Sequence, residues 1–360
     1  MQAPKAKITW KTVLFPILGL VGFFLYIYLF QVDILGIIVT AQRANPLIYS
    51  LAVLFGLLEI LFFTASWRAL TNHLCIKMTL KKAYLYVWYG IYVDIVVPAE
   101  SISGEAARAY LLTRDQCGSF GKVLASLFTH RLLGMAMNVI ILIAGMVLLS
   151  IEGQVSIVVF NFIIFIGASI TAIIAILLIL SYKKAWMLKA ISTITGFAAK
   201  ITKGRWNLDK LKHDAIEIAD HFHNSMIEYR HNPKPLAISM FYLTVTWLFS
   251  LSIPYLVFQA LNYPISWGII LITSAIVLAV KSIPIGIPFE VGIPEATMTT
   301  LYISMGVRPE IAATVTILTR VITLWFRFFI GFAAQQWLEL KPVLSAANGK
   351  TEKTKITPQT

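Results

Sequence analysis

Eight long runs of apolar residues constrain this chain more than any other feature of its sequence. The first run covers residues 12–32, and the others cover residues 46–67, 83–98, 119–150, 155–182, 236–260, 266–288 and 311–338. A transmembrane α-helix needs about 20 such residues in succession. Hydrophobic residues make up 58% of the chain and charged residues only 13%, with a mean hydropathy of +0.78, which excludes an ordinary soluble surface. The sequence therefore predicts an all-α, polytopic membrane protein.

The distribution of Lys and Arg indicates how these runs cross the membrane, because positive charge gathers in cytoplasmic loops. The first run follows Lys5, Lys7 and Lys11 and exceeds a signal-peptide core, so we expect a retained anchor with a cytoplasmic N-terminus. Eight crossings would then place residues 183–235, with their ten Lys and Arg, outside. Two re-entrant hairpins, residues 83–114 and 266–306, remove this conflict. Six full spans remain, with both termini in the cytoplasm.

Both predicted hairpins have tips that contain proline, and proline and glycine break helices. The tips are residues 98–101 and 284–288. Irregular backbone at membrane depth is tolerated only where it lines a protein cavity or is buried in protein. With this topology the cytoplasmic segments carry 23 bases and 8 acids, a net charge of +15, and the exterior loops carry −1. The total of +13 therefore orients the chain and does not indicate nucleic-acid binding.

The two hairpins repeat the same residues at an offset of 190. Pro98-Ala99-Glu100 and Gly104-Glu105-Ala106 in the first correspond to Pro288-Phe289-Glu290 and Pro294-Glu295-Ala296 in the second. An intramembrane arginine, Arg131 or Arg320, follows each second glutamate after about 25 residues. Because the hairpins would enter from opposite faces, we expect an inverted-topology repeat, as in alternating-access transporters.

We expect one membrane domain over residues 1–338, with the first repeat at about 46–150 and the second at about 236–338. A cytoplasmic helical insert is predicted at 183–235 and a polar cytoplasmic tail at 339–360. Within the insert, residues 207–230 have the apolar spacing of an amphipathic helix. Its histidines, His213, His221 and His223, are interpreted as solvated side chains and not as metal ligands.

Eleven charged residues fall inside the predicted membrane region, where each costs at least about 2.5 kcal/mol. They are Glu59, Asp94, Glu100, Glu105, Glu290, Glu295, Arg108, Arg131, Lys281, Arg320 and Arg327. Either these residues line a hydrated cavity for a charged headgroup, or they form salt bridges that hold the hairpins in place. Arginine offers a bidentate fork to lipid phosphate, whereas glutamate suits an amine or a transported proton.

A subset of these charged residues forms the candidate substrate-binding site. The subset is Glu100, Glu105, Arg108, Arg131, Glu290, Glu295, Arg320 and Arg327. Glu105 and Arg108 are three residues apart on the returning half-helix and can face one side. Glu59 and Arg327 have no charged counterparts in the other half, so a structural pair is an equally good interpretation of them. Asp94 and Lys281 rank similarly.

Residues 98–114 (PAESISGEAARAYLLTR) and the following run 125–131 resemble the flippase-like membrane region of lysylphosphatidylglycerol synthases. The most specific part is Gly104-Glu105-x-x-Arg108, and the second hairpin with Arg320 resembles that family's second motif. The resemblance covers roughly residues 10–338. It implies movement of an aminoacylated phospholipid between leaflets, with the separate synthase domain absent because the chain ends in a polar tail, residues 341–360.

The chain departs from this family pattern beside Arg131. It has His130 and Gly134 where family members often carry acidic residues. A cationic lysyl headgroup would favour those acids, so the departure counts against a lysyl-lipid as substrate.

The leading hypothesis is a lipid flippase or transporter of the cell membrane that moves an anionic or zwitterionic polar lipid, with protons as a candidate coupling ion. The alternatives are an intramembrane lipid-modifying enzyme, with Glu105 as general base, and a membrane scaffold for a lipid or glycan transferase. The sequence has no nucleotide-binding loop, and Cys75 and Cys117 are too few for a metal cluster. We therefore expect no cofactor and no metal. The identity of the lipid, the direction of movement and the oligomeric state are left open.

Overall fold

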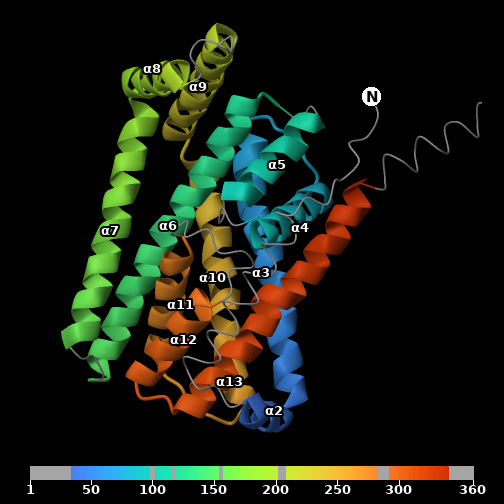
Figure 1. Ribbon diagram of the computed structural model, residues 1–360, viewed down its shortest axis with the longest axis vertical. Coiled ribbons are helices and arrows are strands. Elements are labelled where there is room, and N and C mark those ends of the chain that lie inside the picture. The colour runs from blue at the N-terminus through green and yellow to red at the C-terminus, as the bar shows by residue number, and fades with distance from the viewer. Residues whose placement is uncertain are drawn as a thin grey trace, which may run out of the picture.

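The computed structural model describes residues 34–97, 102–115, 118–153, 157–201, 208–282 and 292–339. Every element in these ranges is helical (Figure 1). In chain order they are α2 (Ile34–Gln42), α3 (Pro46–His73), α4 (Leu80–Val96), α5 (Ile102–Arg114), α6 (Phe120–Ile151), α7 (Ile157–Tyr182), α8 (Lys184–Ile201), α9 (Leu208–His231), α10 (Lys234–Ala260), α11 (Trp267–Lys281), α12 (Ile293–Ser304), α13 (Pro309–Arg320) and the π-helical segment η2 (Val321–Phe326). The predicted all-α class is confirmed for the described residues.

Five helices in the described ranges are long and apolar enough to cross a membrane. They are Pro46–His73, Phe120–Ile151, Phe160–Tyr182, Lys234–Ala260 and Pro309–Glu339, which coincide with five of the six predicted spans. The sixth predicted span, residues 12–32, lies outside the described residues. The count of six spans with two hairpins therefore stays a prediction, while a multi-pass helical membrane bundle is established.

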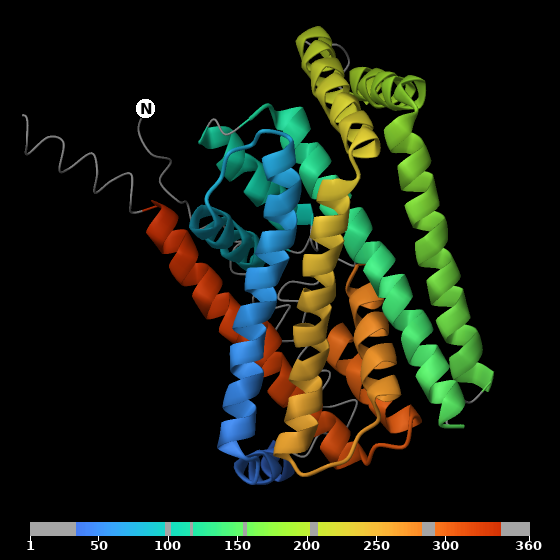
Figure 2. The same ribbon diagram turned by 180° about the vertical axis from the view of Figure 1, so that it is seen from behind.

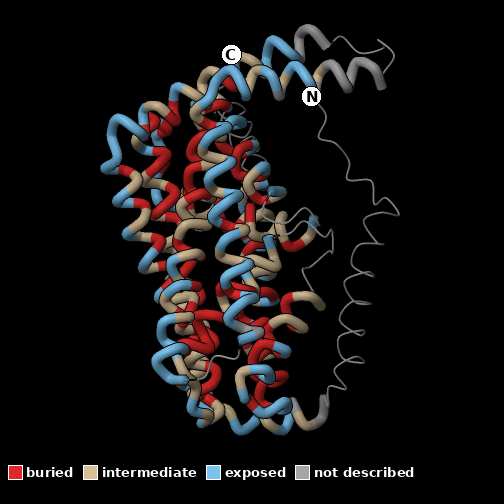
Figure 3. The backbone as a smooth tube through the Cα atoms, turned by 90° about the vertical axis from the view of Figure 1, so that its left-hand side faces the viewer, coloured by how far each residue is buried: buried red, intermediate tan, exposed pale blue. Residues whose placement is uncertain are grey.

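Large apolar side chains cover the outside of this bundle, as expected where lipid replaces water. Ile157 is 76% exposed, Phe165 69% and Phe241 64%. The buried positions run along the inside of the bundle, as the burial colouring in Figure 3 shows. On a soluble monomer, so many exposed apolar side chains would form patches of a kind rarely seen there.

Helices α3 and α10, which open the two predicted repeats, lie side by side along the bundle (Figures 1 and 2). The Asn45 side chain caps α3 by accepting hydrogen bonds from the N–H groups of residues 47 and 48, and Pro46 follows at the first helical position. The Asn45 backbone N–H also donates to the carbonyl of Ala260, 2.8 Å away, at the end of α10. Toward the other end of the pair, the hydroxyls of Ser66 and Ser239 lie 2.8 Å apart. Small polar residues of this kind allow close approach of membrane helices.

Four short helices form two contacting pairs, α4 with α5 and α11 with α12. They have 17, 13, 15 and 12 residues. At about 1.5 Å per residue, each is shorter than the ~30 Å hydrocarbon core. In Figure 1, α5 lies toward the α8–α9 end of the bundle and α12 toward the α2 end. The predicted tips, residues 98–101 and 284–288, lie outside the described residues.

The last long helix of each half packs on the short helices of the other half. Gly145 of α6 lies against α11, where an added Cβ would be 2.9 Å from Ile272 side-chain atoms. Gly331, near the end of the helix that begins with α13, lies against α4, where an added Cβ would be 2.8 Å from the Trp88 carbonyl. The two halves are therefore interleaved reciprocally and not merely placed next to each other.

The base of the α4–α5 pair is closed by Asp115, directly after α5. Its carboxylate lies 2.7 Å from Lys82 Nζ and accepts a hydrogen bond from the Tyr86 hydroxyl. Burial alone would raise the pKa of Asp115, but the hydrogen bonds from Lys82 and Tyr86 hold its pKa below the ordinary value. The ends of α4 and α5 are thus joined by an ionised carboxylate at neutral pH.

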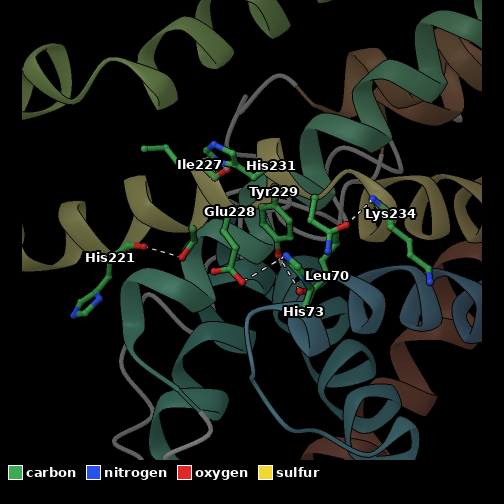
Figure 4. A network of polar contacts seen from close by, with 10 residues as sticks. Leu70, His73, His221, Ile227, Glu228, Tyr229, His231 and Lys234 are labelled. Carbon is green, nitrogen blue, oxygen red and sulfur yellow. Dashed lines mark hydrogen bonds and ion pairs between the residues drawn. The ribbon is translucent and has the colours of Figure 1, made fainter.

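Helix α9 occupies the place of the predicted amphipathic helix, residues 207–230. Figure 4 shows how it is anchored on the end of α3: the Tyr229 hydroxyl donates to the Leu70 carbonyl at 2.9 Å, and His73 lies 3.5 Å from Glu228. The His221 side chain is 44% exposed and lies 3.8 Å from Glu217. The described residues include no group of three or more His, Cys, Asp or Glu that could hold a metal ion.

The sharpest packing constraint between α4 and α5 is Gly104. A Cβ at this position would collide with the Asp94 carboxylate and the Gly90 carbonyl, so only glycine allows α5 to lie this close to α4. We expect Gly104→Ala to destabilise the protein by about 1–3 kcal/mol, because the added carbon overpacks the contact. The thermal midpoint of the protein in detergent measures this.

Gly167→Ala on α7 is the matched control, since an added Cβ there meets nothing within 4 Å. Because alanine has a higher helix propensity than glycine, this variant should be as stable as the wild type or up to about 1 kcal/mol more stable. Equal midpoints for the two variants would contradict the proposed contact between α4 and α5.

Candidate functional site

A cavity of about 400 Å³ opens inside the bundle, between the short helices α4 and α5 on one side and α6, α7 and the end of α11 on the other. Its polar lining residues are Asp94, Glu105, Arg108, His130, Arg131, Asn138 and Ser282. Its apolar wall includes Phe63 of α3, Ile170 of α7 and Leu243 of α10. Leu278 and Ala279 near the end of α11 complete it, so side chains from both halves of the chain enclose one charged space.

Glu105 and Arg131 form an ion pair in the wall of this cavity. Glu105 lies in the first turn of α5, where the helix dipole favours an acid. Its Oε2 is 3.4 Å from Arg131 Nη1, and the two side chains are 23% and 28% exposed. The pair is therefore loose and accessible, and a ligand in the cavity can compete for either partner.

Arg108 is the most unusual side chain of the cavity. Its residue is only 7% exposed, and its guanidinium carbon lies 5.1 Å from the Trp67 ring and 5.8 Å from the Phe63 ring. Its Nε donates a long hydrogen bond of 3.4 Å to the Gly104 carbonyl. Among the described residues, Nη1 of Arg108 has no hydrogen-bond partner. A buried charged donor without an acceptor is costly, so this position favours an incoming anion.

Two further lining residues have unsatisfied polar atoms. His130 Nε2 and Asn138 Oδ1 are buried and have no hydrogen-bond partner within the described ranges. The centroids of the His130 and Phe63 rings lie 4.6 Å apart in an edge-to-face arrangement. Asn138 Nδ2 donates a hydrogen bond to the Ala275 carbonyl of α11 at 3.3 Å. Together with Arg108, these residues offer both donors and acceptors to a polar molecule.

Asp94 was ranked below the main candidates by the sequence, and the structure places it in the cavity wall. Its Oδ1 accepts hydrogen bonds from the Ser103 hydroxyl at 2.8 Å and the Gly104 N–H at 2.6 Å. Asp94 thereby ties α4 to the start of α5. The repeat could not have identified it, because position 284, 190 residues further on, is a proline.

The corresponding pair in the second half has a different environment. Arg320 Nε lies 2.5 Å from Glu295 Oε1, and the two residues are 6% and 3% exposed. Glu295 Oε2 also accepts the Gly292 N–H at 2.7 Å, at the start of α12. Neither residue lines the charged cavity. The sequence repeat matches the glutamate and the arginine of the two halves by position, and the structure has one open pair and one closed pair.

Arg327 pairs with Glu59 of α3 and does not line the charged cavity. The sequence expects a continuous helix over residues 311–338, but six residues, Val321–Phe326, are π-helical. Residues seven apart on an α-helix lie on nearly the same face, and the wider π turn changes this register. Arg320 and Arg327 consequently reach carboxylates of two different helices.

The predicted site residues thus fall into three groups. Glu105, Arg108 and Arg131 meet in the cavity, Glu295 and Arg320 form a separate buried pair, and Arg327 joins Glu59. Glu100 and Glu290 lie outside the described residues.

These features define a multi-pass helical membrane protein with a charged cavity inside the bundle. The family model of the lysylphosphatidylglycerol synthase TM region matches residues 14–331, and the chain belongs to this family. The resemblance seen in the hairpin motifs is therefore confirmed.

Relatives of comparable length occur among archaea. A UPF0104 membrane protein of Pyrococcus horikoshii is 24% identical over 297 residues, which cover 81% of this chain and 87% of the relative. A UPF0104 membrane protein of Methanocaldococcus jannaschii is 23% identical over 351 residues, 96% of this chain and 99% of the relative. Their names describe them as membrane proteins.

Proposed function

We propose that this protein moves a polar lipid between membrane leaflets by binding its headgroup in the charged cavity. The observation that carries the proposal is the buried guanidinium of Arg108, which faces this cavity with an unpartnered donor. Arginine binds phosphate oxygens strongly and in a bidentate manner. A phosphate would supply the acceptors that Arg108 lacks.

The short helices support a transporter architecture. If α4–α5 and α11–α12 are re-entrant, they approach the cavity from opposite membrane faces, as their positions toward opposite ends of the bundle favour (Figure 1). The reciprocal packing of Gly145 on α11 and Gly331 on α4 favours an inverted repeat. The open Glu105–Arg131 pair and the closed Glu295–Arg320 pair then correspond to one access state.

The charge of the cavity constrains the headgroup. Asp94 and Glu105 offset Arg108 and Arg131, so the space is nearly neutral when all four are ionised. Such a space suits a headgroup that carries both a phosphate and an amine. His130 and Gly134, which stand where acids are frequent in the family, both line the cavity and make it a poor site for a headgroup of high positive charge. Glu105 is the candidate to bind the amine or to carry a coupled proton.

Lipid redistribution in proteoliposomes tests the proposal. Vesicles of phosphatidylethanolamine and phosphatidylglycerol receive a trace of a fluorescent analogue of one of these two lipids. A membrane-impermeant quencher reports the leaflet in which the fluorescent lipid lies. The protein should redistribute this lipid faster than empty vesicles do. The double variant Glu105→Gln/Arg131→Gln should lower the rate about 10- to 100-fold, because charge-assisted hydrogen bonds contribute about 1.5–3 kcal/mol.

The matched control is Lys212→Gln/Glu217→Gln, which removes the same two charge types from exposed positions of α9. Its rate should equal that of the wild type. Redistribution no faster than in empty vesicles would refute the transport proposal, and covalent change of the extracted lipid would favour an intramembrane enzyme instead.

A further inference from the structure

A second cavity, with a volume of about 610 Å³, lies on the other side of α5. It is a groove between α5, α6 and α9, lined mainly by apolar side chains that include Ile102, Ala106, Tyr110, Leu124, Phe128 and Phe222. Ile102 is 55% exposed and Tyr110 is 60% exposed, so its rim is open to the surroundings. Its size lies within the range of about 300–1,000 Å³ that is usual for ligand pockets.

Glu105 lines both the groove and the charged cavity. On α5 it is flanked by Ile102 and Ala106 on the groove side, and Arg108 one turn later lines the cavity. Helix α5 thus separates an apolar space from a charged one, and the two spaces meet at this carboxylate. A molecule that occupied both spaces would need a charged end and an apolar end.

We propose that the groove holds one hydrocarbon chain of the lipid whose headgroup enters the charged cavity. This inference rests on the proposed function, because a headgroup cannot reach the cavity without the first part of its tail. A tail leaving the bilayer loses little if it enters another apolar environment, since lipid chains are as apolar as the side chains that replace them. The groove therefore provides a path past α5 that keeps the chain out of the charged cavity.

The position of the groove also indicates the leaflet from which the lipid enters. Phe222 belongs to α9, and α8 and α9 lie at one end of the bundle (Figures 1 and 2). In the predicted topology this end is cytoplasmic. The lipid is consequently taken up sideways from the cytoplasmic leaflet, with its tail between α5 and α6.

A phospholipid with a photoreactive diazirine in its acyl chain tests where the tail lies. After illumination of proteoliposomes, mass spectrometry should find adducts on groove residues such as Tyr110 and Phe222 at least five times more often than on Phe329. Phe329 is the control because it is 61% exposed and does not line the groove. Equal labelling of the groove and of the control would overturn the inference.

Ala106→Trp fills the groove beside Glu105 at an exposed position of α5. This variant should lose the groove adducts and transport two-chain lipid at least fivefold more slowly, yet bind a tail-less glycerophosphoethanolamine as the wild type does. Ala333→Trp, also exposed, should change none of these. Wild-type transport by Ala106→Trp would refute the role of the groove. If the wild type moved no lipid but the groove adducts remained, only the transport proposal would fail.

Discussion

Replacing Arg320 by methionine is expected to lower the free energy of unfolding by about 3–5 kcal/mol, the usual cost of leaving a buried charge without its partner. Glu295 would remain nearly inaccessible, at 3% exposure, and would keep its hydrogen bond from the Gly292 N–H. Its carboxylate would have to protonate or draw in water. The thermal midpoint and the fraction of monodisperse protein in detergent measure the loss.

Two comparison variants separate the buried pair from ordinary surface charge. The double variant Glu295→Gln/Arg320→Met should recover much of the stability, because it removes both charges together. Lys184→Met breaks an exposed pair with Asp220 at 2.9 Å, whose side chains are 46% and 41% exposed, and should cost at most about 1 kcal/mol. Equal costs for Arg320→Met and Lys184→Met would show that the closed pair contributes no more than a surface contact.

Arg108→Met should have the opposite pattern, a large loss of function without a loss of stability. The substitution removes a buried charge whose Nη1 has no partner among the described residues. This relief offsets the lost stacking on Trp67 and Phe63, a contribution of about 2 kcal/mol for a desolvated cation–π contact. Binding of lipid phosphate should weaken about 10- to 100-fold, as expected for hydrogen bonds to a charged group.

The measurement is paired: the rate of lipid redistribution and the thermal midpoint are determined on the same preparation. Arg108→Lys keeps the charge but not the planar fork, so its rate should fall between those of the wild type and Arg108→Met. A midpoint for Arg108→Met well below that of the wild type, with unchanged lipid binding, would make Arg108 a structural residue and remove the observation on which the transport proposal depends.

The different roles of Arg108 and Arg320 follow from what surrounds them. Arg320 has its carboxylate at 2.5 Å and is fully committed to holding α12 on α13. Arg108 lies between aromatic rings with a donor unused. Two arginines that are equally buried, at 7% and 6% exposure, therefore differ in whether a ligand can be accommodated.

The sequence predicted the helical elements well because membrane helices leave a strong local signal. Runs of about 20 apolar residues gave five spans that coincide with helices, and the glycine and proline positions located the short helices α5 and α12. The spacing of Glu105 and Arg108 on one half-helix was also a local property. These features depend on neighbours along the chain, which the sequence contains directly.

Other parts of the site could not be predicted, because they depend on contacts between distant segments. The pairing of Arg327 with Glu59 joins residues 268 positions apart. The place of Asp94 in the cavity depends on α5 folding back on α4, and the apolar groove depends on where α9 meets α6. No periodicity along the chain carries this information.

By itself, the sequence determined a multi-pass helical membrane protein, its family and the repeated set of charged residues within it. Only the tertiary structure decided that Glu105 and Arg131 form an open ion pair in a cavity, whereas Glu295 and Arg320 form a closed pair in the core. The physical reason is desolvation. The water and side chains around a Glu–Arg pair decide whether it is a buried structural ion pair or one that a ligand can reach. Those surroundings come from α6 and α7 in one part of the chain and from α10 and α11 about 50 residues or more further on, which meet only when it folds.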